Sequence, residues 1–86
     1  MGCPRITLEG ITAEVWDCLR ERAGTMGISL PEGVGGTVNH PDADADYAWY
    51  EAIGTLTVTF TRKPDWISCG DLEARIRHAA AVCGGP

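Results

Sequence analysis

The stretch TLTVTFTR, residues 55–62, decides the fold class, because apolar side chains alternate with hydroxyl side chains along it. This two-residue period is that of a strand with one buried face and one exposed face. Leu56, Val58 and Phe60 would face a core, and the intervening threonines would face the other way. A strand that is packed on one side therefore stands at the centre of the expected structure.

A helix is expected soon after this strand. Lys63-Pro64-Asp65 ends the strand, because proline cannot donate a backbone hydrogen bond. Ser68 and Asp71 have the spacing of a capping box, so the helix should begin near Cys69. Its apolar side chains recur every three or four residues, at Cys69, Leu72, Ile76, Ala79 or Ala80, and Cys83. Two ion pairs with four-residue spacing are expected on the outside, Asp71 with Arg75 and Glu73 with Arg77.

The N-terminal part of the chain predicts another strand and another helix. Arg5–Glu9 alternates apolar and polar residues, and Gly10 ends that pattern. Thr12 suits a helix N-cap, and Ile11 before it can pack on Trp16 as a hydrophobic staple. The helix would bury one apolar stripe, formed by Val15, Trp16, Leu19, Ala23 and Met26.

Residues 24–45 are rich in glycine, proline and aspartate, and no period organises them. We expect a long loop there, with a short edge strand at Val34–Val38 as the alternative. Tyr47–Arg62 then reads as a hairpin. The resulting β-α-β-β-α order predicts an α+β fold in which residues 1–86 form one domain. Its sheet would have three mainly antiparallel strands, with two helices packed on one face.

The register of the predicted hairpin decides which aromatic side chains are exposed. A two-residue turn at Gly54-Thr55 would bury Glu51, which is costly for a lone carboxylate. A three-residue loop buries no charge and places Asp46 opposite Arg62, so we favour it. It turns one set of side chains to the open face of the sheet, namely Tyr47, Trp49, Glu51 and Ile53. The alternative, in which Trp49 belongs to the core, stays open.

The acidic residues are concentrated in one part of the chain. Seven Lys and Arg are outnumbered by twelve Asp and Glu, which gives a net charge of −5. Between Ala23 and Thr61 there is no Lys or Arg, but there are five acids, Glu32, Asp42, Asp44, Asp46 and Glu51. This balance argues against direct nucleic-acid binding, which needs a basic surface, and favours a basic protein partner. The alternative is an acidic loop that is merely solvated.

The alternating aspartates at positions 42–46 resemble the first ligands of a calcium loop. The pattern fails at Tyr47, where glycine is needed, and at Ile53, where a glutamate belongs. Only two histidines are present, which makes a closed transition-metal site hard to assemble. We therefore expect no metal and no cofactor.

The four cysteines contain no CxxC spacing. No apolar run is long enough to cross a bilayer, and Met1–Glu9 does not have the sections of a signal peptide. We therefore expect a cytoplasmic protein without membrane contact, whose Cys3, Cys18, Cys69 and Cys83 are thiols. Cys69 at a helix N-terminus could be reactive, but its place on the buried stripe favours an inert thiol. We expect no enzymatic activity.

The segment Thr55–Arg77, with its threonine-alternating strand, its Lys63-Pro64 break and its Ser68-capped helix, resembles small acidic proteins of phages and mobile elements, such as anti-CRISPR proteins. The resemblance implies stoichiometric inhibition without catalysis. The expected function is a non-enzymatic inhibitor or accessory factor that docks on a basic surface of a larger protein, for instance one that normally holds nucleic acid. The partner-binding residues would be Asp42, Asp44, Asp46, Glu51, Tyr47 and Trp49.

Two other functions stay open. One is an assembly module that forms a homodimer or larger oligomer through the open sheet face or an edge strand. The other is a small metal- or thiol-dependent enzyme, which would need a bound ion or a reactive Cys69.

Overall fold

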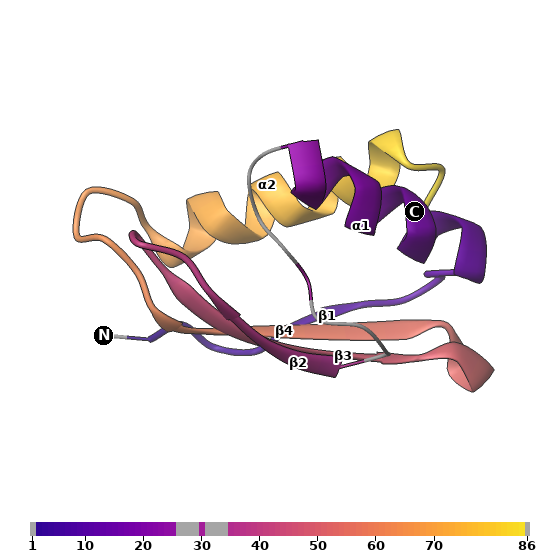
Figure 1. Cartoon of the computed structure of the whole chain (residues 1–86), viewed down its shortest axis with the longest axis horizontal. Helices are drawn as coiled ribbons and strands as arrows, with labels where there is room; N and C mark the ends of the chain where they lie inside the picture. Colours follow the sequence, from indigo (N-terminus) through magenta and orange to yellow (C-terminus); the bar gives the residue numbers. More distant parts are fainter. Residues whose placement is uncertain (1, 26–29, 31–34, 86) are drawn as a thin grey trace.

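The computed structural model describes residues 2–25, 30 and 35–85. In chain order the elements are β1 (Ile6–Leu8), α1 (Ala13–Thr25), β2 (Gly35–Asn39), β3 (Asp44–Tyr50), the 3-10 turn η1 (Glu51–Ile53), β4 (Thr55–Arg62) and α2 (Cys69–Val82). The strands form one antiparallel sheet in the order β1-β4-β3-β2. Both helices cover the same face of it (Figure 1). The α+β class is confirmed, but the sheet has four strands and not three.

The additional strand, β2, lies inside the segment that was expected to be a loop. It pairs with β3 from Gly35 opposite Ala48 to Asn39 opposite Asp44. The turn between the strands is closed by two backbone hydrogen bonds between His40 and Ala43, 2.9 and 3.2 Å long. The edge-strand alternative was therefore correct over 35–38. The first two residues of the expected loop, 24 and 25, belong to α1. Residues 26–29 and 31–34, with Met26 of the expected helix stripe, Glu32 and Val34, lie outside the described residues.

The two predicted helix starts are confirmed. The Thr12 hydroxyl accepts a hydrogen bond of 3.3 Å from the backbone N–H of Val15. The Ser68 hydroxyl accepts one of 3.0 Å from the N–H of Asp71. Each bond satisfies a donor in the first turn that has no partner within the helix. Local sequence therefore determines where both helices begin.

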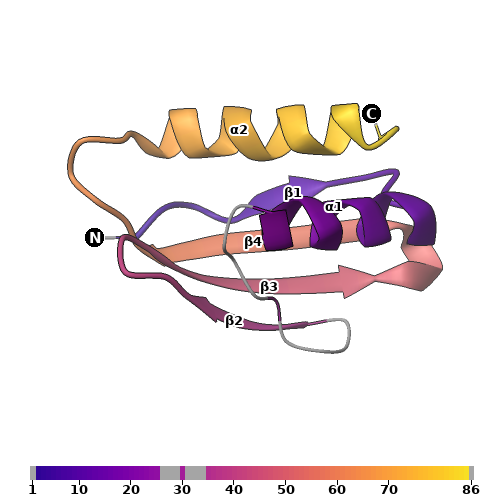
Figure 2. The same ribbon diagram turned by 45° about the horizontal axis from the view of Figure 1, so that its top comes forward.

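All four cysteines are paired, so the expectation of free thiols is wrong. Cys3 bonds to Cys69 and Cys18 bonds to Cys83. The N-terminal segment runs beside β4, where the N–H of Cys3 donates to the carbonyl of Phe60 at 2.8 Å. The two helices lie side by side above the sheet (Figure 2). The partners are 66 and 65 residues apart in sequence, so only the tertiary fold brings them together.

The connection between β3 and β4 differs from both expected turns. Tyr50 lies opposite Thr55, and the four residues Glu51 to Gly54 between β3 and β4 form η1 and a left-handed glycine with a φ of 63°. Glycine adopts this conformation without the steric cost that a Cβ atom would add. Trp49 consequently pairs with Leu56 and turns toward the helices. The favoured three-residue register is therefore wrong.

The core is centred on an aromatic stack between α1 and β3. The rings of Trp16 and Trp49 are stacked at 5.5 Å, and Tyr47 is tilted against Trp16 at 5.6 Å. The indole N–H of Trp49 donates to the carbonyl of Ile11 at 2.9 Å, so its polar atom is satisfied inside the core. Ile11 itself is completely buried. This stack fixes which face of the sheet α1 covers.

Candidate functional site

The four acidic side chains expected to bind a partner do not form one patch. Asp42 lies in the exposed turn between β2 and β3, and Glu51 lies beyond the opposite end of β3. Asp44 is paired with Arg62 at 2.9 Å, and Asp46 accepts a hydrogen bond of 2.7 Å from Thr37. Two of the four carboxylates are therefore already engaged within the molecule.

The pair of Asp44 and Arg62 is tied to the neighbouring turn. The Arg62 guanidinium also donates to the carbonyls of His40 and Pro41, at 2.8 and 3.2 Å. The hydrogen bond to Asp44, and then the charges of Asp44 and Asp42, raise the pKa of Arg62 above its ordinary value, against a smaller opposing effect of desolvation. Arg62 stays charged at physiological pH, so it holds the β2–β3 turn against the end of β4.

The two aromatic residues expected to anchor a partner are core residues. Tyr47 is 8% exposed and Trp49 is 7% exposed, and both point toward the helices. The reading of Trp49 as a core residue was correct. The aromatic side chain of β3 that does reach solvent is Tyr50, which is 53% exposed. Tyr50 and Trp49 are adjacent in a strand and so point to opposite faces of the sheet. A known register would therefore have identified Tyr50 as the exposed residue.

We call the face of the sheet away from the helices the open face, and it carries Thr7, Thr37, Asp46, Ala48, Tyr50, Thr55, Thr57 and Thr59. The pairing arranges these side chains in rows across the strands. Thr7, Thr57 and Ala48 are neighbours in one row, and Thr59, Asp46 and Thr37 are neighbours in the next. The open face is thus a regular surface in which hydroxyl groups predominate.

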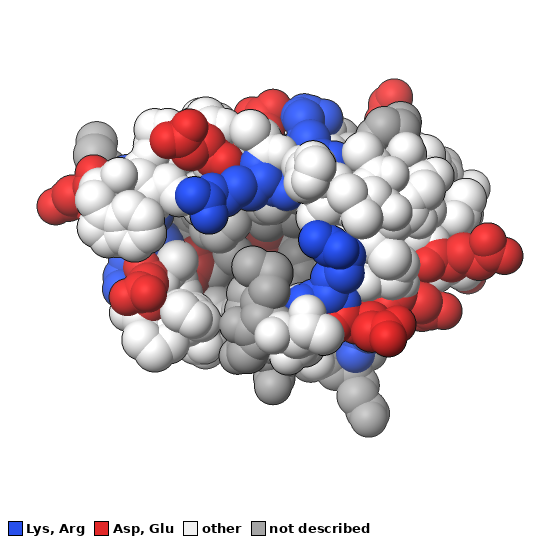
Figure 3. Space-filling model, turned by 90° about the horizontal axis from the view of Figure 1, so that it is seen from above, with Lys and Arg blue, Asp and Glu red and all other residues white. Residues whose placement is uncertain are grey.

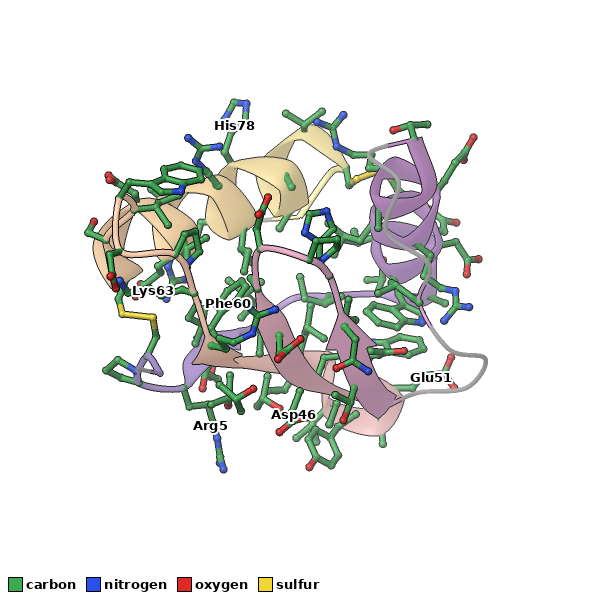
Figure 4. The ribbon with its side chains drawn as sticks, turned by 60° about the vertical axis from the view of Figure 1, so that its left-hand side comes forward. Arg5, Asp46, Glu51, Phe60, Lys63 and His78 are labelled. Atoms are coloured by element: carbon green, nitrogen blue, oxygen red, sulfur yellow. A yellow bond between two sulfur atoms is a disulfide. The ribbon has the colours of Figure 1, made fainter. Side chains whose placement is uncertain are left out.

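A shallow concavity of about 350 Å³ lies in the middle of the open face. Its floor is at Ala48, whose short side chain lies between Asp46 and Tyr50 along β3. Thr57, Thr59 and Arg5 complete its border. Arg5 and Asp46 both point away from the helices (Figure 4). The concavity therefore combines an aromatic ring, one cation, one carboxylate and two hydroxyl groups.

The end of the open face near η1 exposes apolar surface. Ile53 is 71% exposed, and it follows Tyr50 and Glu51 closely in the chain. Exposed tyrosine is enriched at the centres of protein interfaces, where it combines a large apolar ring with a polar tip. Tyr50 with Ile53 therefore resembles the apolar part of an interface, with Asp46 and Glu51 beside it.

The described residues contain no group of three or more His, Cys, Asp or Glu side chains that could hold a metal ion. Cys69 is bonded to Cys3, so it offers no thiol nucleophile in this structure. Over the same described part of the chain, no helix is both long and apolar enough to cross a membrane.

The chain matches no protein-family model, no curated protein and no solved structure.

Proposed function

We propose that this chain is a non-catalytic binding protein, a stoichiometric inhibitor or accessory factor, that engages a larger protein through its open face. The observation that carries the proposal is the exposed Tyr50 beside a concavity on a sheet face that neither helix covers. A flat sheet with its side chains held by strand pairing loses little conformational freedom on binding. Tyr50 takes the anchoring role that the sequence suggested for Tyr47 and Trp49.

A basic partner surface fits this face best. Asp46 borders the same concavity as Tyr50, and Glu51 follows Tyr50 in the chain. Arg5 is the one base that borders the concavity among the residues described. Complementary charge mainly accelerates association and selects among partners, while the buried aromatic contact supplies more of the affinity. The open face is thus expected to bind through Tyr50 and to be oriented by its carboxylates.

The partner is expected in an oxidising compartment. Both crosslinks join segments that are distant in the sequence, Cys3 to Cys69 and Cys18 to Cys83. Disulfides of this structural kind persist in oxidising environments and are rare in the cytosol. The free thiols were expected because the chain was expected in the cytoplasm, and all four cysteines are paired. The proposal therefore favours a partner outside the cytosol over a cytosolic nucleic-acid complex.

The test is affinity capture with the oxidised protein from the medium and envelope extract of its source cells. Tyr50→Thr should lose the retained partner, and Asp46→Asn with Glu51→Gln should weaken retention and flatten its dependence on salt. His78→Ala is the matched control, because His78 lies on the outer side of α2, opposite the open face (Figure 4). Equal retention by the Tyr50 variant and the wild type would refute the proposal.

Self-association is the second candidate function, and the two sheet edges favour it. β2 and β1 are the terminal strands of the sheet, so within the described residues each has one edge that pairs with no other strand. Such edges can pair with a second copy. Light scattering after size-exclusion chromatography separates the two functions. A dimer that Tyr50→Thr leaves intact would indicate that the two copies pair through their sheet edges and not through the open face.

A further inference from the structure

The inner side of α2 does not close against the sheet. A groove of about 450 Å³ lies between them. A smaller cavity of about 150 Å³ lies further inside, between the two helices and the sheet. The two spaces share Val38, Ala45 and Ile76 as wall residues. The groove and the smaller cavity are therefore neighbours on the inner side of α2.

The walls of these two spaces are mostly apolar, and the polar side chains in them lie in the groove. Phe60 and Leu72 line the groove, and Trp16 and Leu56 line the inner cavity. Phe60 points from the sheet toward α2 (Figure 4). Trp66 stands at the groove with 77% of its surface exposed. Sites for small molecules are typically mostly apolar spaces of about 300 to 1,000 Å³ with few polar groups. The groove, at about 450 Å³, falls in that range by itself.

One charged side chain at the groove forms no ion pair with a described carboxylate. Arg75 of α2 lines the groove, and among the described residues no carboxylate forms an ion pair or hydrogen bond with it. The expected pair of Asp71 with Arg75 is thus absent, whereas Glu73 and Arg77 are paired at 2.8 Å. Figure 3, which views the helix side, shows Lys and Arg side chains on two sides of a hollow there.

The carboxylate across the groove, that of Asp42, acts on a base of its own side. Its charge helps to raise the pKa of Arg62, and the backbone N–H of Asp42 donates to the Nδ1 atom of His40 at 3.1 Å. Part of the charge of Asp42 is therefore offset by Arg62. A ligand anion would gain a charge-assisted hydrogen bond at Arg75, which no described carboxylate occupies.

We propose that this groove binds a free long-chain carboxylic acid, with its chain in the apolar space and its carboxylate at Arg75. An extended peptide fits less well, because the mostly apolar walls would leave many of its backbone N–H and C=O groups without partners. An alkyl chain has no such groups. Each methylene that leaves water contributes to affinity, and the groove runs inward from the cation toward Trp16 and Leu56.

The test is isothermal titration of the oxidised protein with dodecanoate below its micelle concentration. One molecule is expected to bind per chain. Arg75→Gln should weaken binding about tenfold or more, because a charge-assisted hydrogen bond is lost. Dodecanol should bind wild type and Arg75→Gln equally, since it has no charge to lose. Arg77→Gln is the control on the same helix and should bind dodecanoate as wild type does.

A second variant tests where the alkyl chain of the ligand lies. Ala79 lines the inner cavity, so Ala79→Leu should shorten the space and weaken dodecanoate and dodecanol alike. Its circular dichroism should stay that of the wild type. No saturable binding to wild type would overturn the proposal, and so would wild-type affinity in both Arg75→Gln and Ala79→Leu. Tyr50 lies on the other face, so this result is independent of binding at the open face.

Discussion

The two helices cover the same face of the sheet, but they are held there in different ways. α1 buries Val15 and Trp16, and Trp16 stacks on Trp49 of β3 at 5.5 Å. In α2 the fully buried residue is Ala80, and a groove separates much of the helix from the sheet. Disulfides instead hold α2 at Cys69, its first residue, and at Cys83, just after its last. Packing on the sheet positions α1. Crosslinks position α2, one to the N-terminal segment at Cys3 and one to α1 itself at Cys18.

Removing both disulfides should have the largest effect and should act mainly on α2. Each closes a loop of about 65 residues, for which the loss of chain entropy in the unfolded state is worth about 4 kcal/mol. Replacing all four cysteines by serine should therefore lower the free energy of unfolding by about 4 kcal/mol or more. Urea denaturation measures the loss, and amide exchange locates it.

The exchange pattern decides whether the contrast between the helices is real. Amides of α2 should exchange much faster in the serine variant, and those of α1 should keep more of their protection. Equal loss of protection in both helices would show that packing and crosslinks contribute alike to each.

Breaking the aromatic stack tests the other half of the comparison. Trp16→Ala removes the ring that contacts both Trp49 and Tyr47, so we expect a loss of about 3–5 kcal/mol with the disulfides intact. Trp66→Ala is the matched control, because Trp66 is largely exposed. It should change the free energy of unfolding by less than about 0.5 kcal/mol. Similar losses for the two tryptophans would contradict the packing argument.

The parts of the fold that sequence predicted are those encoded locally. The alternation of residues 55–62 is visible without knowledge of any partner strand. The caps at Thr12 and Ser68 act within one turn of helix. β2 was uncertain because Gly35 and Gly36 hide its short alternation. Its strand character depends on pairing with β3, which is a tertiary property.

The disulfides and the candidate site were missed for a related reason. Cysteine pairs 65 and 66 residues apart leave no local spacing pattern. The open face depended on the register of one hairpin, and β3 carries aromatic residues on both of its faces, Tyr47 and Trp49 inside and Tyr50 outside. Hydrophobicity alone therefore could not show which face of β3 is buried. The turn that η1 and the left-handed Gly54 form sets the register, and the register determines the buried face.

The helix caps provide a finer comparison of the two helices. Ser68→Ala should cost about 1 kcal/mol, because it leaves the N–H of Asp71 without its 3.0 Å partner. Thr12→Ala should cost less, about 0.5 kcal/mol, since the hydrogen bond from Val15 is longer, at 3.3 Å. Thermal unfolding of the two oxidised variants gives both values. A larger cost at Thr12 would mean that α1, too, depends on its terminus and not only on the Trp16 stack.

Tyr50→Thr should have the smallest effect on stability and the largest on binding at the open face. Threonine keeps the strand preference of the position and faces Thr55 across the pair. Because Tyr50 is half exposed and lies outside the core cluster, we expect a change of less than about 0.5 kcal/mol in the free energy of unfolding. A loss of several kcal/mol, measured by urea denaturation, would show that Tyr50 has a structural role. An exposed aromatic residue that the fold does not need is free to serve recognition. If Tyr50→Thr keeps the stability of the wild type but loses the retained partner, then the open face functions in binding and does not contribute to the packing under the helices.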